Sequence, residues 1–101
     1  MKKLTPDFIQ SLIANTEYQR FELLTICVLT LKNGFKVTGQ SSPVSAENFN
    51  ADIGKQIAYN NALDKIWELE GYLLKQRLYE HQTELPTEQA KAVRKEILGL
   101  D

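Results

Sequence analysis

The chain has 101 residues, of which 43% are hydrophobic and 25% charged, close to the averages of globular proteins. A chain of this length holds one modest core, so we expect residues 1–101 to form a single domain. Twelve basic and thirteen acidic residues give a formal charge of −1, which provides no field that would gather phosphate backbones. This balance argues against duplex nucleic acid as a partner.

The chain carries a single cysteine, Cys27, inside the apolar run TICVL, so no disulfide can form within it. Free cysteine is among the most buried residue types, and we expect a buried, unreactive thiol in a reducing cytoplasm. The sequence has no run of about 18 apolar residues that would cross a membrane. Its start lacks the apolar stretch and cleavage site of a signal peptide, so the protein is expected to be cytoplasmic.

The first element expected is a short amphipathic helix over residues 6–15. Residues 5–7, Thr-Pro-Asp, combine a capping side chain, a proline suited to the first helical position and an acid that complements the positive helix end. The apolar residues that follow recur at helical spacing: Phe8, Ile9, Leu12 and Ile13.

From Phe21 the sequence becomes rich in β-branched and aliphatic residues, and Asn33-Gly34 then interrupts it. Asn-Gly between two strand-like runs predicts a hairpin, because both residues accept the positive φ of a tight turn. We therefore expect strands over residues 21–32 and 35–40. Alternation places Leu24, Ile26 and Val28 on one face of the first strand, and Phe21, Leu23, Cys27, Leu29 and Leu31 on the other.

A long amphipathic helix is expected over residues 51–82, with Asn50 as its N-cap. Leu85-Pro86-Thr87 then breaks the helix, and a short C-terminal helix follows over residues 88–98. Helices and a hairpin in this order predict an α+β fold.

The predicted hairpin carries more apolar surface than the chain can easily cover. A two-stranded hairpin is marginal alone, its two edges are open, and the long helix can cover one face only. Burial of a Leu or Ile side chain stabilises a protein by roughly 1.5 to 3 kcal/mol, and an exposed one loses that contribution. The total free energy of unfolding is only about 5 to 15 kcal/mol. We therefore expect homo-oligomerisation to complete the fold. The alternative is a monomer whose core is closed jointly by the first and the C-terminal helices.

Two glycines and several aromatic residues of the long helix favour an interface. Gly54 and Gly71 each cost about 1 kcal/mol relative to alanine, which indicates close approach of another group. Aromatic residues on a helix without interleaved basic residues are more typical of a core or a protein interface than of a base-stacking platform. The predicted interface consists of Leu24, Ile26, Val28, Gly54, Trp67, Gly71 and Tyr72.

One region resembles a weak anion site. Small polar residues gather just before the long helix, whose exposed N–H groups and positive end attract anions. The candidate residues for an anion or a nucleotide are Ser41, Ser42, Ser45, Asn48, Lys55 and Tyr59. No Gly-rich phosphate loop is present, so helix capping alone is the competing interpretation.

No arrangement of residues predicts catalysis, a metal or a cofactor. His81 is the single histidine and lacks the clustered ligands of a zinc site, so we interpret it as a solvated residue near a helix end. Asp64 and Glu68 lie one turn apart on the polar face, as on an ordinary solvated surface. We therefore expect a protein that is not an enzyme.

A set of short motifs resembles a family of small tailed-phage and prophage proteins, the gene-product forty-nine / sixty-six type. The resemblance covers roughly residues 23–78 and leaves out the first helix and the tail. Its motifs are Asn33-Gly34-Phe35, Val37-Thr38-Gly39, Asn48-Phe49, Ile53-Gly54, Ala58-Tyr59, Asn61-Ala62, Trp67 and Leu69-Glu70-Gly71-Tyr72-Leu73-Leu74.

The resemblance implies a phage accessory protein and supplies no catalytic residues. By analogy with phage proteins of this size, two hypotheses follow. The first is stoichiometric binding that inhibits a host or defence protein, and the partner could also be a phage protein. The second is an oligomer that sequesters a nucleotide-like signalling molecule. If the protein is phage-encoded, either would act in the host cytoplasm.

Overall fold

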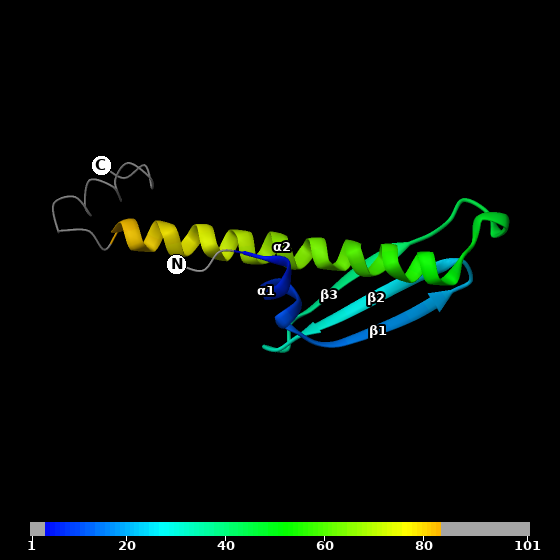
Figure 1. Cartoon of the computed structure of the whole chain (residues 1–101), viewed down its shortest axis with the longest axis horizontal. Helices are drawn as coiled ribbons and strands as arrows, with labels where there is room; N and C mark the ends of the chain where they lie inside the picture. The colour runs from blue at the N-terminus through cyan, green and yellow to red at the C-terminus, as the bar shows by residue number, and fades with distance from the viewer. Residues whose placement is uncertain (1–3, 84–101) are drawn as a thin grey trace. The chain divides into compact units, whose positions relative to one another are not determined.

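The computed structural model describes residues 4–83 of the chain (Figure 1). They form an α+β fold with a short N-terminal helix, a three-stranded antiparallel sheet and a long helix, which confirms the predicted class. The elements are α1 (Pro6–Ser11), β1 (Ile13–Phe21), β2 (Leu24–Leu31), β3 (Lys36–Ser41), a short 3-10 helix η1 (Ala46–Asn48) and α2 (Ala51–Thr83).

Helix α1 begins as predicted but is shorter than predicted. The Thr5 hydroxyl accepts a hydrogen bond from the Phe8 N–H at 3.1 Å, and Pro6 lies in the first turn. The helix ends at Ser11, not at residue 15, because Ile13 already begins the first strand of the sheet. The apolar spacing from Phe8 to Ile13 therefore spans a helix and the start of a strand.

Strand β1 was not predicted. Eight of its nine residues are exposed, so apolar and polar residues do not alternate along it as they do in a half-buried strand. A two-residue turn joins it to β2, since Phe21 pairs with Leu24, and Glu22 lies in the left-handed region at φ 55°. The expected strand over residues 21–32 therefore combines the end of β1, this turn and β2. The sheet has three strands instead of two, and β1 and β3 are its edges.

The hairpin around Asn33-Gly34 is confirmed, but of these two residues only Gly34 takes the positive φ that was expected of both. Gly34 has φ 91°, and its N–H donates to the Leu31 carbonyl at 2.8 Å. The Asn33 side-chain oxygen accepts from the Phe35 N–H at 3.0 Å. Strands β2 and β3 then pair antiparallel from Thr30 opposite Lys36 to Thr25 opposite Ser41.

Helix α2 begins where its cap predicts. The Asn50 side-chain oxygen accepts from the N–H groups of Asp52 and Ile53, at 3.0 and 3.1 Å. The helix runs for 33 residues, close to the expected range of 51–82. The helix expected over residues 88–98 lies outside the described residues.

The residues up to Leu69 form one compact unit, in which the beginning of α2 packs on one face of the sheet (Figure 1). Its core is built from side chains of β2, β3, α2 and α1: Cys27, Leu29, Leu31, Val37, Ala58, Ala62, Ile66 and Ile9. The Asn61 side chain adds a hydrogen bond to the Gln40 carbonyl at 2.8 Å. A second unit starts at Glu70 and includes the rest of α2.

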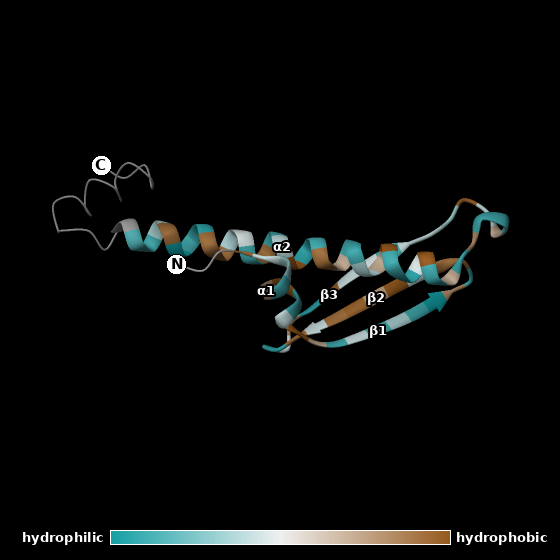
Figure 2. Ribbon diagram, viewed as in Figure 1, coloured by the Kyte–Doolittle hydropathy of each residue, from teal (hydrophilic) through white to brown (hydrophobic). Residues whose placement is uncertain are grey.

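The opposite face of the sheet is not covered by any described element. We call it the open sheet face and define it by Leu24, Ile26 and Val28 of β2, which are half-buried between their neighbouring strands. Ile9 of α1 lies in the core on the other side, so α1 does not cover this face. Strand β2 is the most hydrophobic strand in Figure 2, whereas β1 is mainly polar. The expectation of two apolar faces on this strand is therefore met.

Candidate functional site

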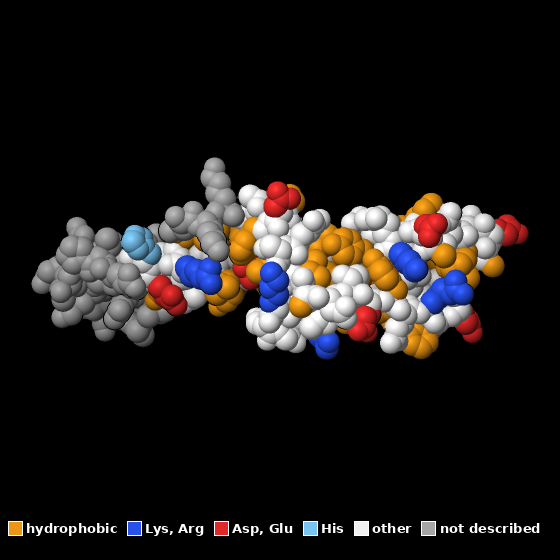
Figure 3. All heavy atoms as spheres, turned by 60° about the horizontal axis from the view of Figure 1, so that its bottom comes forward, with side chains coloured by type: hydrophobic (Ala, Val, Ile, Leu, Met, Phe, Trp, Pro, Cys, Tyr) orange, Lys and Arg blue, Asp and Glu red, His pale blue; other side chains and the backbone are white. Residues whose placement is uncertain are grey.

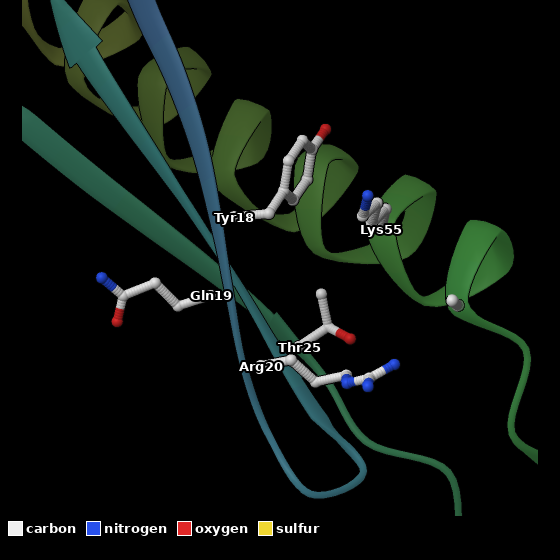
Figure 4. Close-up of a pocket in the computed structure, with 6 residues that line it drawn as sticks. Tyr18, Gln19, Arg20, Thr25 and Lys55 are labelled. Atoms are coloured by element: carbon white, nitrogen blue, oxygen red, sulfur yellow. The ribbon is translucent and has the colours of Figure 1, made fainter.

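A cavity of about 350 Å³ lies between β1, β2 and the start of α2 (Figure 4). Its lining residues are Tyr18, Gln19, Arg20, Thr25, Ala51 and Lys55. We call it the cationic cavity, because Arg20 and Lys55 are its charged residues. Alternation along β1 directs Tyr18 and Arg20 to the side of the sheet on which α2 packs, whereas the Gln19 side chain points the other way.

Aromatic rings hold both cations of this cavity in place. The Lys55 amino group lies 5.4 Å from the centre of the Tyr18 ring, and the Arg20 guanidinium lies 5.2 Å from the centre of the Phe49 ring. These are cation–π distances, which position a charge without neutralising it. Within residues 4–83, neither cation has a carboxylate at ion-pair distance.

Thr25 lies at the floor of the same cavity and is 2% exposed. Its hydroxyl oxygen is buried and has no hydrogen-bond partner among the described residues. Gly54 of α2 makes room for it, because a Cβ built on Gly54 would lie 3.2 Å from that oxygen. The close approach that the sequence predicts at Gly54 is therefore made within the chain, between α2 and β2.

A smaller cavity of about 150 Å³ lies beside the loop before α2. Three of the predicted ligand residues line it, namely Ser41, Ser42 and Asn48. Much of the remaining lining is apolar and consists of Leu23, Pro43, Phe49, Ile53 and Ile57. The polar residues of this segment therefore border an apolar hollow without any cation in its lining.

The structure therefore divides the predicted anion site between two cavities. Lys55 lies in the cationic cavity and not with the serines. Tyr59 packs against the core near Tyr18, and Ser45 precedes η1 without a side-chain capping bond. Sequence reasoning missed Tyr18, Arg20 and Thr25 because β1 was not recognised. Tyr18 and Arg20 are two positions apart, so they point to the same side of the sheet once residues 13–21 are recognised as a strand. This spacing was the signal in the sequence, and it cannot be interpreted without that assignment.

Cys27 is buried, as predicted, and carries no disulfide. Burial raises the pKa of its thiol, and a hydrogen bond with Tyr18 offsets part of that rise. Burial likewise raises the pKa of the Tyr18 hydroxyl, and the neighbouring Cys27 and Tyr59 add to the effect. A thiol that stays protonated at neutral pH is a poor nucleophile.

Other residues of the predicted interface lie in different surroundings. Trp67 is half-buried and packs against the core. Gly71 has no atom within 4 Å of the position that a Cβ would take, and Tyr72 is 72% exposed. Neither of these two residues is therefore explained by packing within the described chain.

His81 is exposed in the last turn of α2. Across residues 4–83, no three His, Cys, Asp or Glu side chains gather closely enough to hold a metal ion. In the same part of the chain, no helix combines the length and the apolar composition needed to span a membrane.

Comparison with known proteins identifies a family. The family described as phage protein (N4 Gp49/phage Sf6 gene 66) matches residues 4–78. The match begins at residue 4 and not near residue 23, so it also includes α1 and β1. No curated protein matches the chain, and no solved structure does either.

Proposed function

The chain belongs to the phage protein (N4 Gp49/phage Sf6 gene 66) family, and from this premise we propose that it is a non-enzymatic accessory protein acting by stoichiometric binding. Its partner is a host or phage protein, and occupation of a host protein, such as a defence protein, inhibits that protein in the host cytoplasm. No resident cofactor is required for such an action.

The observation that carries this proposal is the open sheet face. Leu24, Ile26 and Val28 form an apolar stripe along the central strand, and no described element covers it. Polar residues border the stripe on both neighbouring strands: Glu17 and Gln19 on β1, and Thr38 and Gln40 on β3. An apolar centre with a polar rim is the usual composition of a protein interface.

Further apolar side chains are exposed at the start of α2. Ile53 is 58% and Ile57 is 44% exposed, and the two lie one turn apart. Figure 3 shows hydrophobic side chains at the surface of the molecule, with charged side chains scattered between them. Ile53 and Ile57 therefore form a second exposed apolar surface, on the side of the sheet where α2 packs and not on the open sheet face.

We propose that the free protein is a homo-oligomer, in which a second copy occupies the open sheet face until the partner protein displaces it. A second copy can cover the open sheet face, and a small domain gains most from such burial, because it buries a low fraction of its own surface. The commonest closed form is a two-fold dimer, in which the same patch of each copy meets the other. Exposed Tyr72, and the open space beside Gly71, are then available for further contacts.

The experiment is a pull-down from host lysate with the tagged full-length chain. We expect one host or infection-derived protein to be retained at physiological salt and to form a complex of fixed stoichiometry when both proteins are purified. Ile26→Lys should lose the partner, whereas Gln10→Lys, which adds the same charge on the exposed side of α1, should keep it. A chain that retains no partner under these conditions leaves the proposal without support.

A second candidate is favoured by the cationic cavity. The protein would sequester a nucleotide-like signalling molecule, and Arg20, Lys55 and Tyr18 offer the charges and the ring that such a ligand needs. Calorimetry with cyclic nucleotides and ADP-ribose derivatives tests it. Heat of binding that disappears in Lys55→Ala would support this function, and the absence of heat with every member would count against it.

A further inference from the structure

We propose that the cationic cavity is a binding site for a phosphomonoester no larger than a mononucleotide, whose phosphate lies between Arg20 and Lys55 above the Thr25 hydroxyl. This inference deepens the second candidate function and rests on it. It assigns the phosphate to residues of β1, β2 and α2, not to the serines that precede α2.

The two cations suit a phosphate. Arg20 and Lys55 come from β1 and α2, and both line the one cavity (Figure 4). A guanidinium can donate two parallel hydrogen bonds to phosphate oxygens, and an ammonium adds a compact charge. Because Arg20 and Lys55 lie over the faces of the Phe49 and Tyr18 rings, which accept no conventional hydrogen bond, the N–H groups of both cations remain available to a ligand.

The start of α2 adds charge but few donors. The N–H groups of Asp52 and Ile53 already donate to the Asn50 side chain, and the Gly54 N–H donates to the Asn50 carbonyl at 2.8 Å. The positive end of the helix therefore favours an anion in the cavity, while the side chains make the direct contacts.

Thr25 supplies the independent observation. A buried hydroxyl without a partner costs about 1 to 3 kcal/mol, so most buried hydroxyls are hydrogen-bonded. Here the hydroxyl belongs to a lining residue of the cavity, and in Figure 4 the Thr25 side chain extends with Arg20 toward the start of α2. A phosphate oxygen bound in this cavity can accept a hydrogen bond from the hydroxyl.

The size of the cavity limits the ligand. A volume of about 350 Å³ is near the lower end of small-molecule sites, which begin at about 300 Å³. It accepts a phosphate with one sugar or one nucleoside. Tyr18 provides the apolar wall against which the uncharged part of the ligand can rest.

The test is calorimetry of the full-length protein with adenosine monophosphate, inorganic phosphate and adenosine as probes. We expect the monophosphate to bind more tightly than inorganic phosphate, and adenosine to give no heat. Loss of a charge-assisted hydrogen bond corresponds to at least about a tenfold loss of affinity. Arg20→Gln and Lys55→Gln should therefore each lower the affinity for the monophosphate by at least that factor. Thr25→Val should weaken it several-fold.

Lys65→Gln is the matched control, because Lys65 is an exposed lysine of the same helix and lines a different cavity. It should leave affinity unchanged. Equal losses in Lys65→Gln and Lys55→Gln would show a diffuse charge effect and overturn the site. Nuclear magnetic resonance supplies a second readout: the monophosphate should shift the amide signals of Tyr18, Arg20 and Thr25, and shifts confined to other residues would overturn it.

The two proposals fail in distinguishable ways. Monophosphate binding that is untouched by Arg20→Gln and Lys55→Gln overturns this site but leaves the second candidate function standing. No binding of any phosphorylated probe, including the cyclic nucleotides and ADP-ribose derivatives, overturns both. Lys55 is exposed, so Lys55→Gln keeps the fold even if Arg20→Gln does not.

Discussion

Gly39 of β3 lies directly against the backbone of Ala58 in α2. A Cβ built on Gly39 would collide with the Ala58 carbonyl and with the Ala62 nitrogen, and neither atom belongs to a side chain that could rotate away. Ala58 and Ala62 are themselves fully buried, so three small residues bring the helix onto the sheet. This contact fixes the height of α2 above the sheet, and therefore the depth of the cavities at its start.

Gly39→Ala should strongly destabilise the protein. Overpacking usually costs about 1 to 3 kcal/mol, and a collision with backbone belongs at or above the upper end of that range. Urea unfolding of the variant should show this loss in the free energy of unfolding. Retention of wild-type stability would mean that α2 can shift away from β3.

Gly71→Ala is the matched control, because no atom lies within 4 Å of the position of its Cβ. Alanine in a helix interior is favoured over glycine by about 1 kcal/mol, so this variant should be more stable by up to that amount. If Gly71 lies in the oligomer interface, the same change should reduce the mass measured by light scattering, which would locate the interface.

Thr25→Val should stabilise the free protein. The substitution keeps the shape of the side chain, favours the strand and removes a buried hydroxyl that has no partner among the described residues. We expect a gain of about 1 kcal/mol in the free energy of unfolding, measured without ligand. A loss of comparable size would mean that the hydroxyl makes a hydrogen bond in solution, for example to an ordered water molecule.

The buried thiol of Cys27 should make the protein less stable at alkaline pH. Burial raises its pKa in the folded chain above the ordinary value of 9.0. The unfolded chain therefore ionises first, so the stability contributed by the protonated thiol is present below pH 9 and is lost as the pH rises toward the folded-state value. Tyr18, whose pKa burial also raises, acts in the same direction at higher pH.

Thermal unfolding at a series of pH values from about 8 to about 10 measures this loss. Cys27→Ala should flatten the pH dependence in that range, even though it lowers stability by opening a small cavity. A thiol reagent should react with Cys27 only after unfolding. Rapid reaction in the folded protein would contradict the burial of this side chain.

The elements with strong local signals could be predicted from sequence. Asn33-Gly34 indicated the second hairpin, in which Gly34 takes the positive φ that few residues accept. Asn50 marked the first turn of α2 because its side chain satisfies two free N–H groups. Cys27 was expected in the core from its apolar neighbours and from the usual burial of free cysteine. Each of these assignments depends on a preference of one residue or of its close neighbours.

Strand β1 could not be predicted in the same way. It is an exposed edge strand, held by backbone hydrogen bonds to β2, so its side chains carry little of the alternation that identifies a strand. Its turn uses Glu22 at positive φ, a position that the sequence does not mark with glycine or asparagine. Because β1 was not predicted, the cationic cavity was not predicted either: Tyr18 and Arg20 come from β1 and Lys55 from α2, and only the fold brings them to one cavity.

The role of Gly39 was hidden for a related reason. Glycine is required at position 39 because α2 crosses it closely, and Ala62, one of the residues that it meets there, is more than twenty positions away in the sequence. No local sequence pattern reports such an approach. Gly54 was recognised as a close-approach position, but its partner Thr25 belongs to a strand and not to another chain. Sequence periodicity can identify a tight contact without identifying the group that makes it.

The mass of the purified full-length protein, measured by light scattering over a range of concentrations, tests the central claim that the open sheet face is a binding surface. We predict a mass of two or more subunits for the wild type and for Gln10→Lys, and a mass of one subunit for Ile26→Lys with its helical content unchanged. A wild-type mass of one subunit at the highest concentration, or an Ile26→Lys variant that associates as the wild type does, would contradict the account.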